Sequence, residues 1–276
     1  MKPLRISAIS YLNTAPLMWD FERGAVEGFE ISYTLPAQCA ASLQAGSADI
    51  GIIPAAAWCS IPDLAVIPGV AIASRQAVRS ILLVSKVPLA DIHSVALDTS
   101  SMTSVALTKV LFGKWWGGER RFAAMAPDIE QMLKQHDAGL LIGDSALRID
   151  RSQYETYDLA EEWIRLTGKP FVFAFWAVRQ AALQAPASDD LAALFQQSRD
   201  HGLKPENVDQ LACEWAPRLG LSEKMVREYL TRNIHYFLDA ECLAGLRLFY
   251  RYADECGALP AAAPLQFLEV ARAAAS

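Results

Sequence analysis

Residues 5–17 read RISAISYLNTAPL. The first part, residues 5–10, has the short apolar pattern of a β-strand. Asn13 and Thr14 then come just before Pro16, and a capping residue followed by an early proline is typical of a helix start. A strand that passes directly into a helix is the unit from which α/β folds are built, so this stretch predicts that class.

The same alternation continues to about residue 178. Short apolar runs predict strands at residues 28–35, 49–53, 64–67, 70–73, 78–85, 95–98, 139–142 and 171–178. Amphipathic or capped runs predict helices at residues 37–45, 54–58, 102–112, 128–136 and 158–168, the last opened by a capping box at Asp158 and closed by Gly168. Beyond about residue 188 only helices are expected, with Ser188 and Ser222 as caps, Pro205 as a first helical residue, and final helices at residues 239–256 and 260–274.

Two α/β sets follow one another, separated by the break Lys86-Val87-Pro88. Chain crossings near residues 85–90 and 178–187 predict two lobes about a hinge, and the C-terminal helices are expected to return to the first lobe. We therefore expect lobe I at residues 1–87 plus 182–276 and lobe II at residues 88–181. This layout resembles the two-lobed periplasmic-binding-protein fold, in which the ligand lies in the cleft between the lobes.

Composition excludes several function classes. The chain of 276 residues is 53% hydrophobic, carries a net charge of −6 and has no basic cluster, which argues against binding nucleic acid. Its longest apolar stretches, residues 50–58 and 170–178, are far shorter than the roughly 18 residues of a membrane span. Five widely spaced cysteines form no C-x-x-C pair, which argues against a disulfide framework and a zinc site. The N-terminus runs into strand-like sequence without a signal peptide, so we expect a cytoplasmic protein.

The first candidate site is the end of the strand in residues 5–10. The polar or hydrogen-bonding side chains here belong to Ser10, Tyr11, Asn13 and Thr14. In open α/β sheets, ligands bind at such carboxyl ends of strands, and the free N–H groups of a helix start favour an anion. The alternative is that Asn13 or Thr14 only caps the helix.

The second candidate site is a hydroxyl-rich helix start after the strand at residues 95–98. Its residues are Thr99, Ser100, Ser101, Met102, Thr103 and Ser104. The run lacks the Gly-x-x-x-x-Gly-Lys phosphate loop, so it suits a carboxylate better than a nucleotide phosphate. The alternative is an exposed polar loop. Two such helix starts, one in each lobe, would together suit a ligand with two carboxylates.

Four motifs carry a family resemblance: SYLNTAPL (residues 10–17), TSSMTSVALTKVLF (99–112), LIGDSALR (141–148) and GKPFVFA (168–174). They occur in the order typical of the chorismate dehydratase family of the futalosine route to menaquinone, and the similarity spans at least residues 6–180. The resemblance implies a type II periplasmic-binding-protein fold and a hydro-lyase that converts chorismate to 3-[(1-carboxyvinyl)oxy]benzoate and water. It implies no metal and no organic cofactor.

The resemblance also implies site roles. The substrate's own enolpyruvyl carboxylate would take the proton, while Asn13 and Ser80, the latter in a first-lobe strand, would supply hydrogen bonds. Asp144 is a further candidate, to bond the departing hydroxyl, to act as an alternative base, or to cap the turn into residues 146–148. Arg79 either meets a substrate carboxylate or lies on the outer face.

The four histidines are expected to be ordinary solvated or packed residues: His93, His136, His201 and His235. Two other functions stay open, a non-catalytic carboxylate-binding protein of the cytosol and the related dihydroxynaphthoate synthase. The partner is a small molecule, and the sequence leaves open whether the chain is a monomer or a homodimer and whether its lobes are open. If the site is right, Asn13, Ser80 and residues 101–104 meet in one interlobe pocket.

Overall fold

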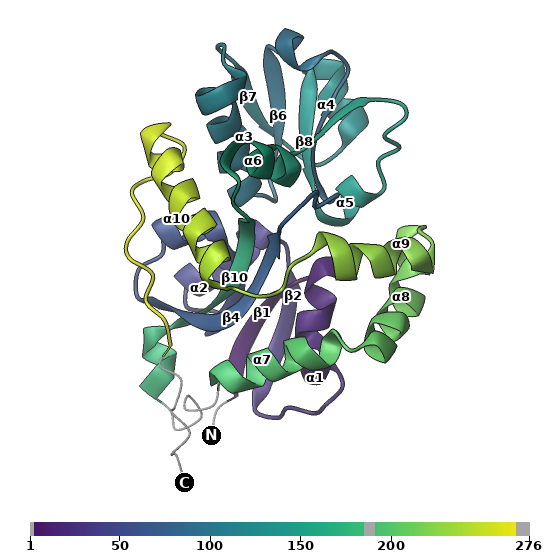
Figure 1. Ribbon diagram of the computed structural model, residues 1–276. Coiled ribbons are helices and arrows are strands. Elements are labelled where there is room, and N and C mark those ends of the chain that lie inside the picture. Colours follow the sequence, from purple (N-terminus) through teal and green to yellow (C-terminus); the bar gives the residue numbers. More distant parts are fainter. Residues whose placement is uncertain (1–2, 185–190, 269–276) are drawn as a thin grey trace.

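The computed structural model describes residues 3–184 and 191–268 and shows two α/β lobes stacked one above the other (Figure 1). Each lobe holds one five-stranded mixed sheet. The first sheet has the order β2-β1-β3-β10-β4, with strands β1 (Leu4–Ile9), β2 (Phe29–Thr34), β3 (Ile50–Pro54), β4 (Leu64–Ser74) and β10 (Phe171–Arg179). The second has the order β7-β6-β8-β5-β9, with strands β5 (Ile81–Ser85), β6 (Ser94–Asp98), β7 (Arg121–Met125), β8 (Ala138–Ile142) and β9 (Glu155–Asp158).

The chain passes between the sheets earlier than the sequence predicts. Strand β5 pairs with β8 and β9 in the second sheet, whereas β10 pairs with β3 and β4 in the first. The predicted lobe boundaries at 87/88 and 181/182 therefore each fall one strand too late. Both strands are almost wholly buried apolar runs, and such a run carries no local sign of the sheet that it joins. Lys86-Val87-Pro88 is a turn inside lobe II.

Helices cover both sheets, and several of them begin where the sequence predicts. The α-helices are α1 (Trp19–Glu22), α2 (Pro36–Gln44), α3 (Thr103–Leu111), α4 (Ile129–Gln135), α5 (Gly143–Leu147), α6 (Leu159–Thr167), α7 (Leu191–Gly202), α8 (Pro205–Leu219), α9 (Glu223–Glu228) and α10 (Ala240–Glu255). Asp158 and Ser222 cap α6 and α9 by accepting backbone N–H groups, and Pro205 opens α8, as predicted. Ser188 lies outside the described residues.

Short 3₁₀ or π segments complete the helical part: Leu12–Met18, Ala55–Cys59, Phe112–Trp116 and Tyr229–Asn233 among them. The helix predicted at residues 260–274 is absent from its described part, residues 260–268. There the chain is extended and pairs with β4, because Val66 N donates to Gln266 O and Leu268 N donates to Val66 O. Pro260 and Pro264 interrupt any helix at this point.

Other strand predictions need smaller corrections. The two strands predicted at residues 64–67 and 70–73 form the single strand β4, and the strand predicted at 78–85 begins only at Ile81. Strands β7 and β9 are missed, because both are short, lie at sheet edges and contain partly exposed residues.

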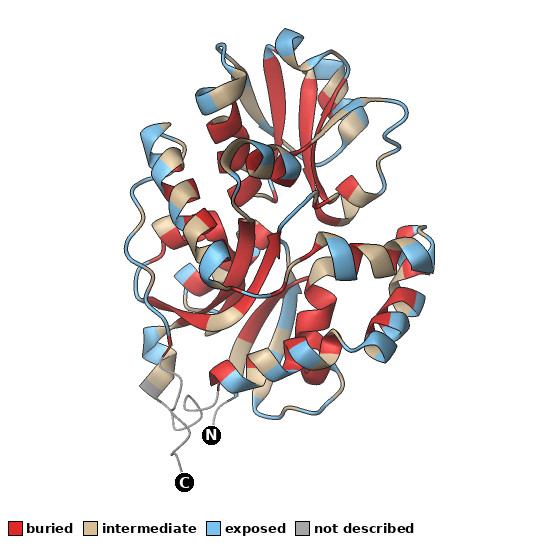
Figure 2. Cartoon of the chain, in the orientation of Figure 1, coloured by how far each residue is buried: buried red, intermediate tan, exposed pale blue. Residues whose placement is uncertain are grey.

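Both lobes contain buried segments (Figure 2), and their apolar side chains form a large cluster that runs through both lobes. A smaller cluster around Leu82, Val84 and Met132 packs on the second sheet. Helix α10 contacts both β10 of lobe I and α3 of lobe II. The lobes therefore share one core. Within the described ranges, no helix combines the length and the apolar character needed to cross a membrane.

Candidate active site between the lobes

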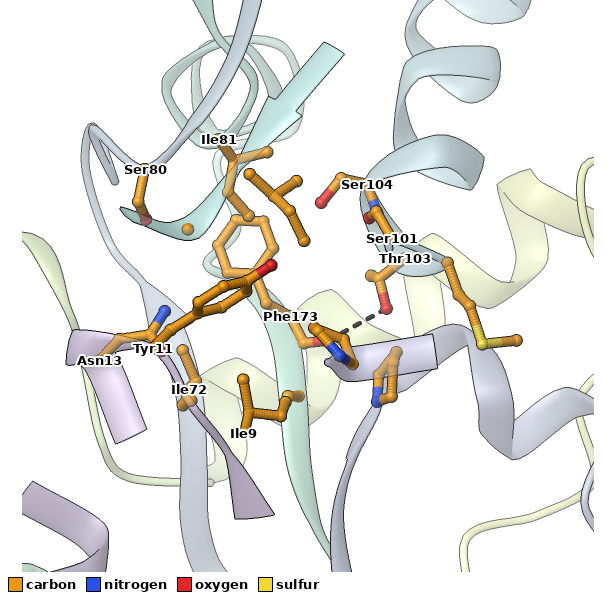
Figure 3. A pocket seen from close by; sticks show the side chains of 16 residues that line it. Ile9, Tyr11, Asn13, Ile72, Ser80, Ile81, Ser101, Thr103, Ser104 and Phe173 are labelled. Atoms are coloured by element: carbon orange, nitrogen blue, oxygen red, sulfur yellow. Dashed lines mark hydrogen bonds between the residues drawn. The ribbon is translucent and has the colours of Figure 1, made fainter. Parts of the chain in front are cut away.

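A cavity lies between the lobes, the place where two-lobed folds usually bind small molecules. Lobe I supplies Ile9, Tyr11, Asn13, Pro36, Pro54, Ile72, Phe173 and Ala174, while the crossing and lobe II supply Ser80, Ile81, Ser101, Met102, Thr103, Ser104, Ile142 and Gly143. In Figure 3, Ser80 and Asn13 lie on one side and the start of α3 on the other, with the Tyr11 ring reaching between them. The predicted convergence of Asn13, Ser80 and residues 101–104 on one interlobe pocket is confirmed.

Several candidate residues, Thr99 among them, are not in this wall. Ser10 and Thr14 line a neighbouring cavity that shares Ile9 and Tyr11 with the first. Ser100 and Asp144 are absent from the lining of both cavities. Direct contact with a ligand in the interlobe cavity therefore belongs to the smaller set of Tyr11, Asn13, Ser80 and the start of α3.

The helix start in lobe I is already occupied by a protein carboxylate. Leu12–Met18 is a 3₁₀ helix whose cap position is Tyr11, so neither Asn13 nor Thr14 is the cap. The Leu12 N–H donates to Asp144 Oδ1 over 3.1 Å, across the lobe interface. The anion at this helix start is thus Asp144, and it caps the facing helix instead of its own turn at residues 146–148.

This contact also sets the charge state of Asp144. Burial raises the pKa of Asp144 to about 6, while the Leu12 N–H and the charge of Arg148 act in the opposite direction. Asp144 is therefore mostly ionised at neutral pH, and the hydrogen bond that it accepts joins the two lobes. The Ala37 N–H, which donates to Ser100 O over 3.2 Å, is a second hydrogen bond between the lobes.

The hydroxyl groups at the start of α3 are of two kinds: some are bonded within the protein, and others are free to bond a ligand. Ser100 Oγ donates to Asp98 Oδ1, and Thr103 Oγ1 donates to Phe173 O while it accepts from the Ala56 N–H. Ser101 Oγ accepts from the Ser104 N–H at the start of the helix, which leaves its own hydrogen free. Ser104 Oγ has no hydrogen bond to any described residue. Ser101 and Ser104 are thus the hydroxyls available to a ligand.

Tyr11 can lie across the interface because residue 143 is glycine. Gly143 has φ +59°, and a Cβ at this position would lie 2.7 Å from the Tyr11 ring. The Gly143 N–H also donates to Ser80 O over 2.8 Å. This glycine therefore connects Tyr11, the strand end of β8 and Ser80.

Ser80 lies in the crossing between β4 and β5. The prediction that it lies within a strand of the first lobe is therefore wrong. Two backbone N–H groups before it donate to the buried carboxylate of Asp158, that of Val78 over 3.1 Å and that of Arg79 over 2.6 Å. Arg79 has φ +65°, which is a strained conformation for a residue other than glycine. Arg79 is absent from the cavity wall. The crossing is thus held in a strained shape that places Ser80 at the cavity.

The cavity wall is uncharged: among the described residues that line it, none is Asp, Glu, Lys, Arg or His. His201 bonds Asp20, and His235 bonds Asp239. His235, Asp239 and Cys242 are close enough together to share a metal ion. However, Asp239 is committed to Arg75 and to capping α10, so these residues fit a structural role better.

Comparison with known proteins places this geometry in a family. A family model described as menaquinone biosynthesis matches residues 4–255. The chain belongs to the menaquinone-biosynthesis family. It is similar to a protein of Thermus thermophilus named chorismate dehydratase, with 30% identity over 90% of this chain and 94% of the relative.

Solved structures show how widely the fold of this menaquinone-biosynthesis protein occurs. A protein of Archaeoglobus fulgidus superposes with a TM-score of 0.78 at 17% identity, covering 93% of this chain and 98% of its own. A Candida albicans protein described as having the generic periplasmic binding protein fold gives 0.67 at 12% identity, covering 98% of each chain. The periplasmic aliphatic sulphonate binding protein of Escherichia coli gives 0.65 at 16% identity, covering 100% of this chain and 96% of its own. The fold is that of the periplasmic binding proteins, as predicted.

The sequence did not predict that Tyr229 lies next to the site. The Tyr229 hydroxyl donates to Ser80 Oγ over 2.8 Å, from the helical C-terminal third of the chain. No motif in that region points to it, since Tyr229 lies in an ordinary amphipathic stretch. The sequence also contained no sign that Asp158 accepts hydrogen bonds from Val78 and Arg79. Its position before a helix is fully explained by capping that helix.

Proposed function

We propose that this chain is a chorismate dehydratase, which converts chorismate to 3-[(1-carboxyvinyl)oxy]benzoate and water. The observation that carries the proposal is the meeting of Asn13, Ser80 and the start of α3 in one interlobe cavity. Asn13 and the start of α3 belong to the motifs that resemble the family, Ser80 is a site residue that the same resemblance implies, and the Thermus thermophilus relative bears that name.

The reaction requires the protein to position the substrate more than to supply a general acid or base. Loss of water makes the ring aromatic, so the reaction is strongly downhill. A ring C–H proton passes to the enolpyruvyl carboxylate of the substrate, and the electron pair stays on the ring. The carboxylic acid so formed then gives this proton to the ring hydroxyl, which leaves as water while the electron pair forms the new ring double bond. The uncharged wall supports this course, because none of the described residues that line it is a Brønsted base of suitable pKa.

Neutral donors would bind the substrate in this proposal. The Asn13 amide and the Ser80 hydroxyl would hydrogen-bond the reacting groups, where preorganised donors stabilise developing charge. Ser101, Ser104 and the N-terminus of α3 would hold a carboxylate, since the first N–H groups of a helix lack partners in their own helix. Asp144 would act through Leu12 and stay out of contact with the substrate.

We also propose that the protein is cytoplasmic and that its partner is a small molecule. The protein itself would be a monomer or a homodimer. All five cysteines are free, which is usual in a reducing compartment. Cell fractionation followed by immunoblotting tests the location, and light scattering of the purified protein tests the oligomeric state.

The deciding experiment is incubation of purified protein with chorismate, followed by mass spectrometry of the products. We expect loss of one water. The rate should fall about 10²–10³-fold in Asn13→Ala, which removes a preorganised donor. Asn207→Ala is the matched control, because the Asn207 side chain bonds His201 O and is absent from the cavity wall.

Single His→Ala variants at the four histidines should keep their activity. Chorismate left unchanged by the wild type would favour a non-catalytic carboxylate-binding protein. A naphthoate product from another substrate would favour the related synthase.

A further inference from the structure

The C-terminal region contributes a buried phenol to the site. Tyr229 is 2% exposed and Ser80 is 1% exposed, and the phenol donates to Ser80 Oγ over 2.8 Å although the two residues are 149 positions apart. Tyr229 opens a π-helical turn, Tyr229–Asn233, directly after α9. Single π turns are rare and often occur at functional sites.

The segment that follows Tyr229 runs beside the crossing that carries Ser80. Asn233 Nδ2 donates to Ala77 O over 2.8 Å. The backbones of His235 and Ala73 exchange two hydrogen bonds of 2.8 and 2.9 Å. Residues 229–235 therefore support residues 73–80, and the strained turn at Arg79 is held both by this segment and by Asp158.

The direction of the Tyr229 hydrogen bond decides what Ser80 can do. The phenol is the donor in this bond. Burial raises the pKa of Tyr229 far above its ordinary value, against the smaller effects of hydrogen bonds with Ser80 and Asn13, so the phenol keeps the hydrogen that it donates. Ser80 Oγ accepts that hydrogen bond and keeps its own hydrogen free. Among the described residues none accepts this hydrogen, and Ser80 lines the cavity.

We propose that Tyr229 is a positioning residue for the dehydration: it holds the Ser80 hydroxyl so that this group donates its hydrogen to the substrate in the cavity. The inference rests on the proposed function and adds to it a residue from the helical third of the chain. Tyr229 acts through Ser80 and does not need to touch the substrate.

The test compares Tyr229→Phe with Tyr250→Phe in steady-state kinetics on chorismate. Tyr250 is a matched control, because it is also buried and its hydroxyl donates one hydrogen bond of 2.8 Å, to Ala55 O, without lining the cavity. We expect Tyr229→Phe to lower kcat about tenfold with KM within about twofold, since one oriented hydrogen bond is lost. Tyr250→Phe should leave kcat within about twofold of the wild type.

A double-mutant cycle then separates positioning from packing. In a Ser80→Ala background, Tyr229→Phe should lower kcat by less than about twofold further, because residues that act as one unit are not additive. 3-Fluorotyrosine at position 229 keeps the ring and the donor, so it should retain at least about half of the wild-type kcat even if the phenylalanine variant fails to fold.

Three results would overturn the inference. These are an unchanged kcat in Tyr229→Phe, equal losses in both backgrounds, and a 3-fluorotyrosine enzyme as slow as the phenylalanine variant. A wild-type protein that leaves chorismate unchanged would overturn the proposed function and the inference together, whereas active wild type with one of these three results overturns the inference alone.

Discussion

At the scale of single residues, backbone strain lies directly beside the site. Arg79 occupies the left-handed region at φ +65° and precedes Ser80. The Arg79 N–H is held by Asp158, and the next residue is held by Tyr229, so contacts on both sides impose the conformation. Strain of this kind persists only where the surroundings enforce it, and here it aims a serine at the cavity.

Glycine and alanine at position 79 should show the reverse of their usual order of stability. Outside the left-handed region, alanine is the more favourable residue. At φ +65°, Arg79→Gly should exceed Arg79→Ala in free energy of unfolding by about 1 kcal/mol, because glycine carries no Cβ. Urea unfolding of both variants checks the order.

The same two variants test the alternative role of Arg79. Because Arg79 is absent from the cavity wall, both should keep kcat/KM for chorismate within about twofold of the wild type. A loss in both that exceeds this limit would instead assign the guanidinium to a substrate carboxylate.

At the scale of elements, the start of α3 has two kinds of hydroxyl group. Thr103 ties the helix to lobe I through Ala56 and Phe173, whereas Ser104 lines the cavity without a described partner. Residues one position apart on the same helix turn thus serve the fold and the site separately.

Ser104→Ala and Thr103→Val should therefore fail in different ways. Ser104→Ala should raise KM for chorismate about five- to tenfold with an unchanged melting temperature, since it removes one ligand hydrogen bond. Thr103→Val should lower the free energy of unfolding by about 1–3 kcal/mol, because the Ala56 N–H loses its acceptor inside the protein. Steady-state kinetics and thermal melting of both variants measure these two effects. Equal melting temperatures of the two variants would contradict the prediction.

At the scale of the whole molecule, Asp144 connects the lobes and makes stability depend on pH. Its pKa of about 6 lies above the ordinary 3.8, so the folded state favours the protonated form. This contribution to stability is present at low pH and is lost as pH rises from about 4 to about 6.

Asp144→Asn should avoid that loss. The amide oxygen can still accept the Leu12 N–H, so the variant should exceed the wild type in free energy of unfolding by about 1–3 kcal/mol near pH 7.5 and match it near pH 4. Denaturant unfolding at both pH values measures the difference. A variant that is less stable near pH 7.5 would show that the charged carboxylate stabilises the interface.

Asp137→Asn is a control of opposite sign. Hydrogen bonds from the N–H groups of His93 and Ser94 and from the Ser94 hydroxyl hold the pKa of Asp137 below its ordinary value, although burial acts against them. Its stabilising contribution is therefore present above the ordinary pKa and lost as pH falls. Asp137→Asn should be less stable than the wild type near pH 7.5, and the difference should shrink toward pH 3.

The sequence by itself determined the features that depend on near neighbours. The alternation of strands and helices, the caps at Asp158 and Ser222 and the left-handed end at Gly168 each involve residues only a few positions apart. The four motifs also predicted the family and the fold, and the family resemblance that they carry predicted the convergence of Asn13, Ser80 and residues 101–104.

Only the tertiary structure decided the features that join distant parts of the chain. It placed β5 and β10 in their sheets, paired Asp144 with Leu12 over 132 positions and brought Tyr229 to Ser80 over 149. A strand buried on both faces looks the same in either sheet, and a tyrosine or aspartate in an amphipathic stretch carries no mark of its distant partner. The physical reason is that packing of the shared core, and not local preference, brings these groups together.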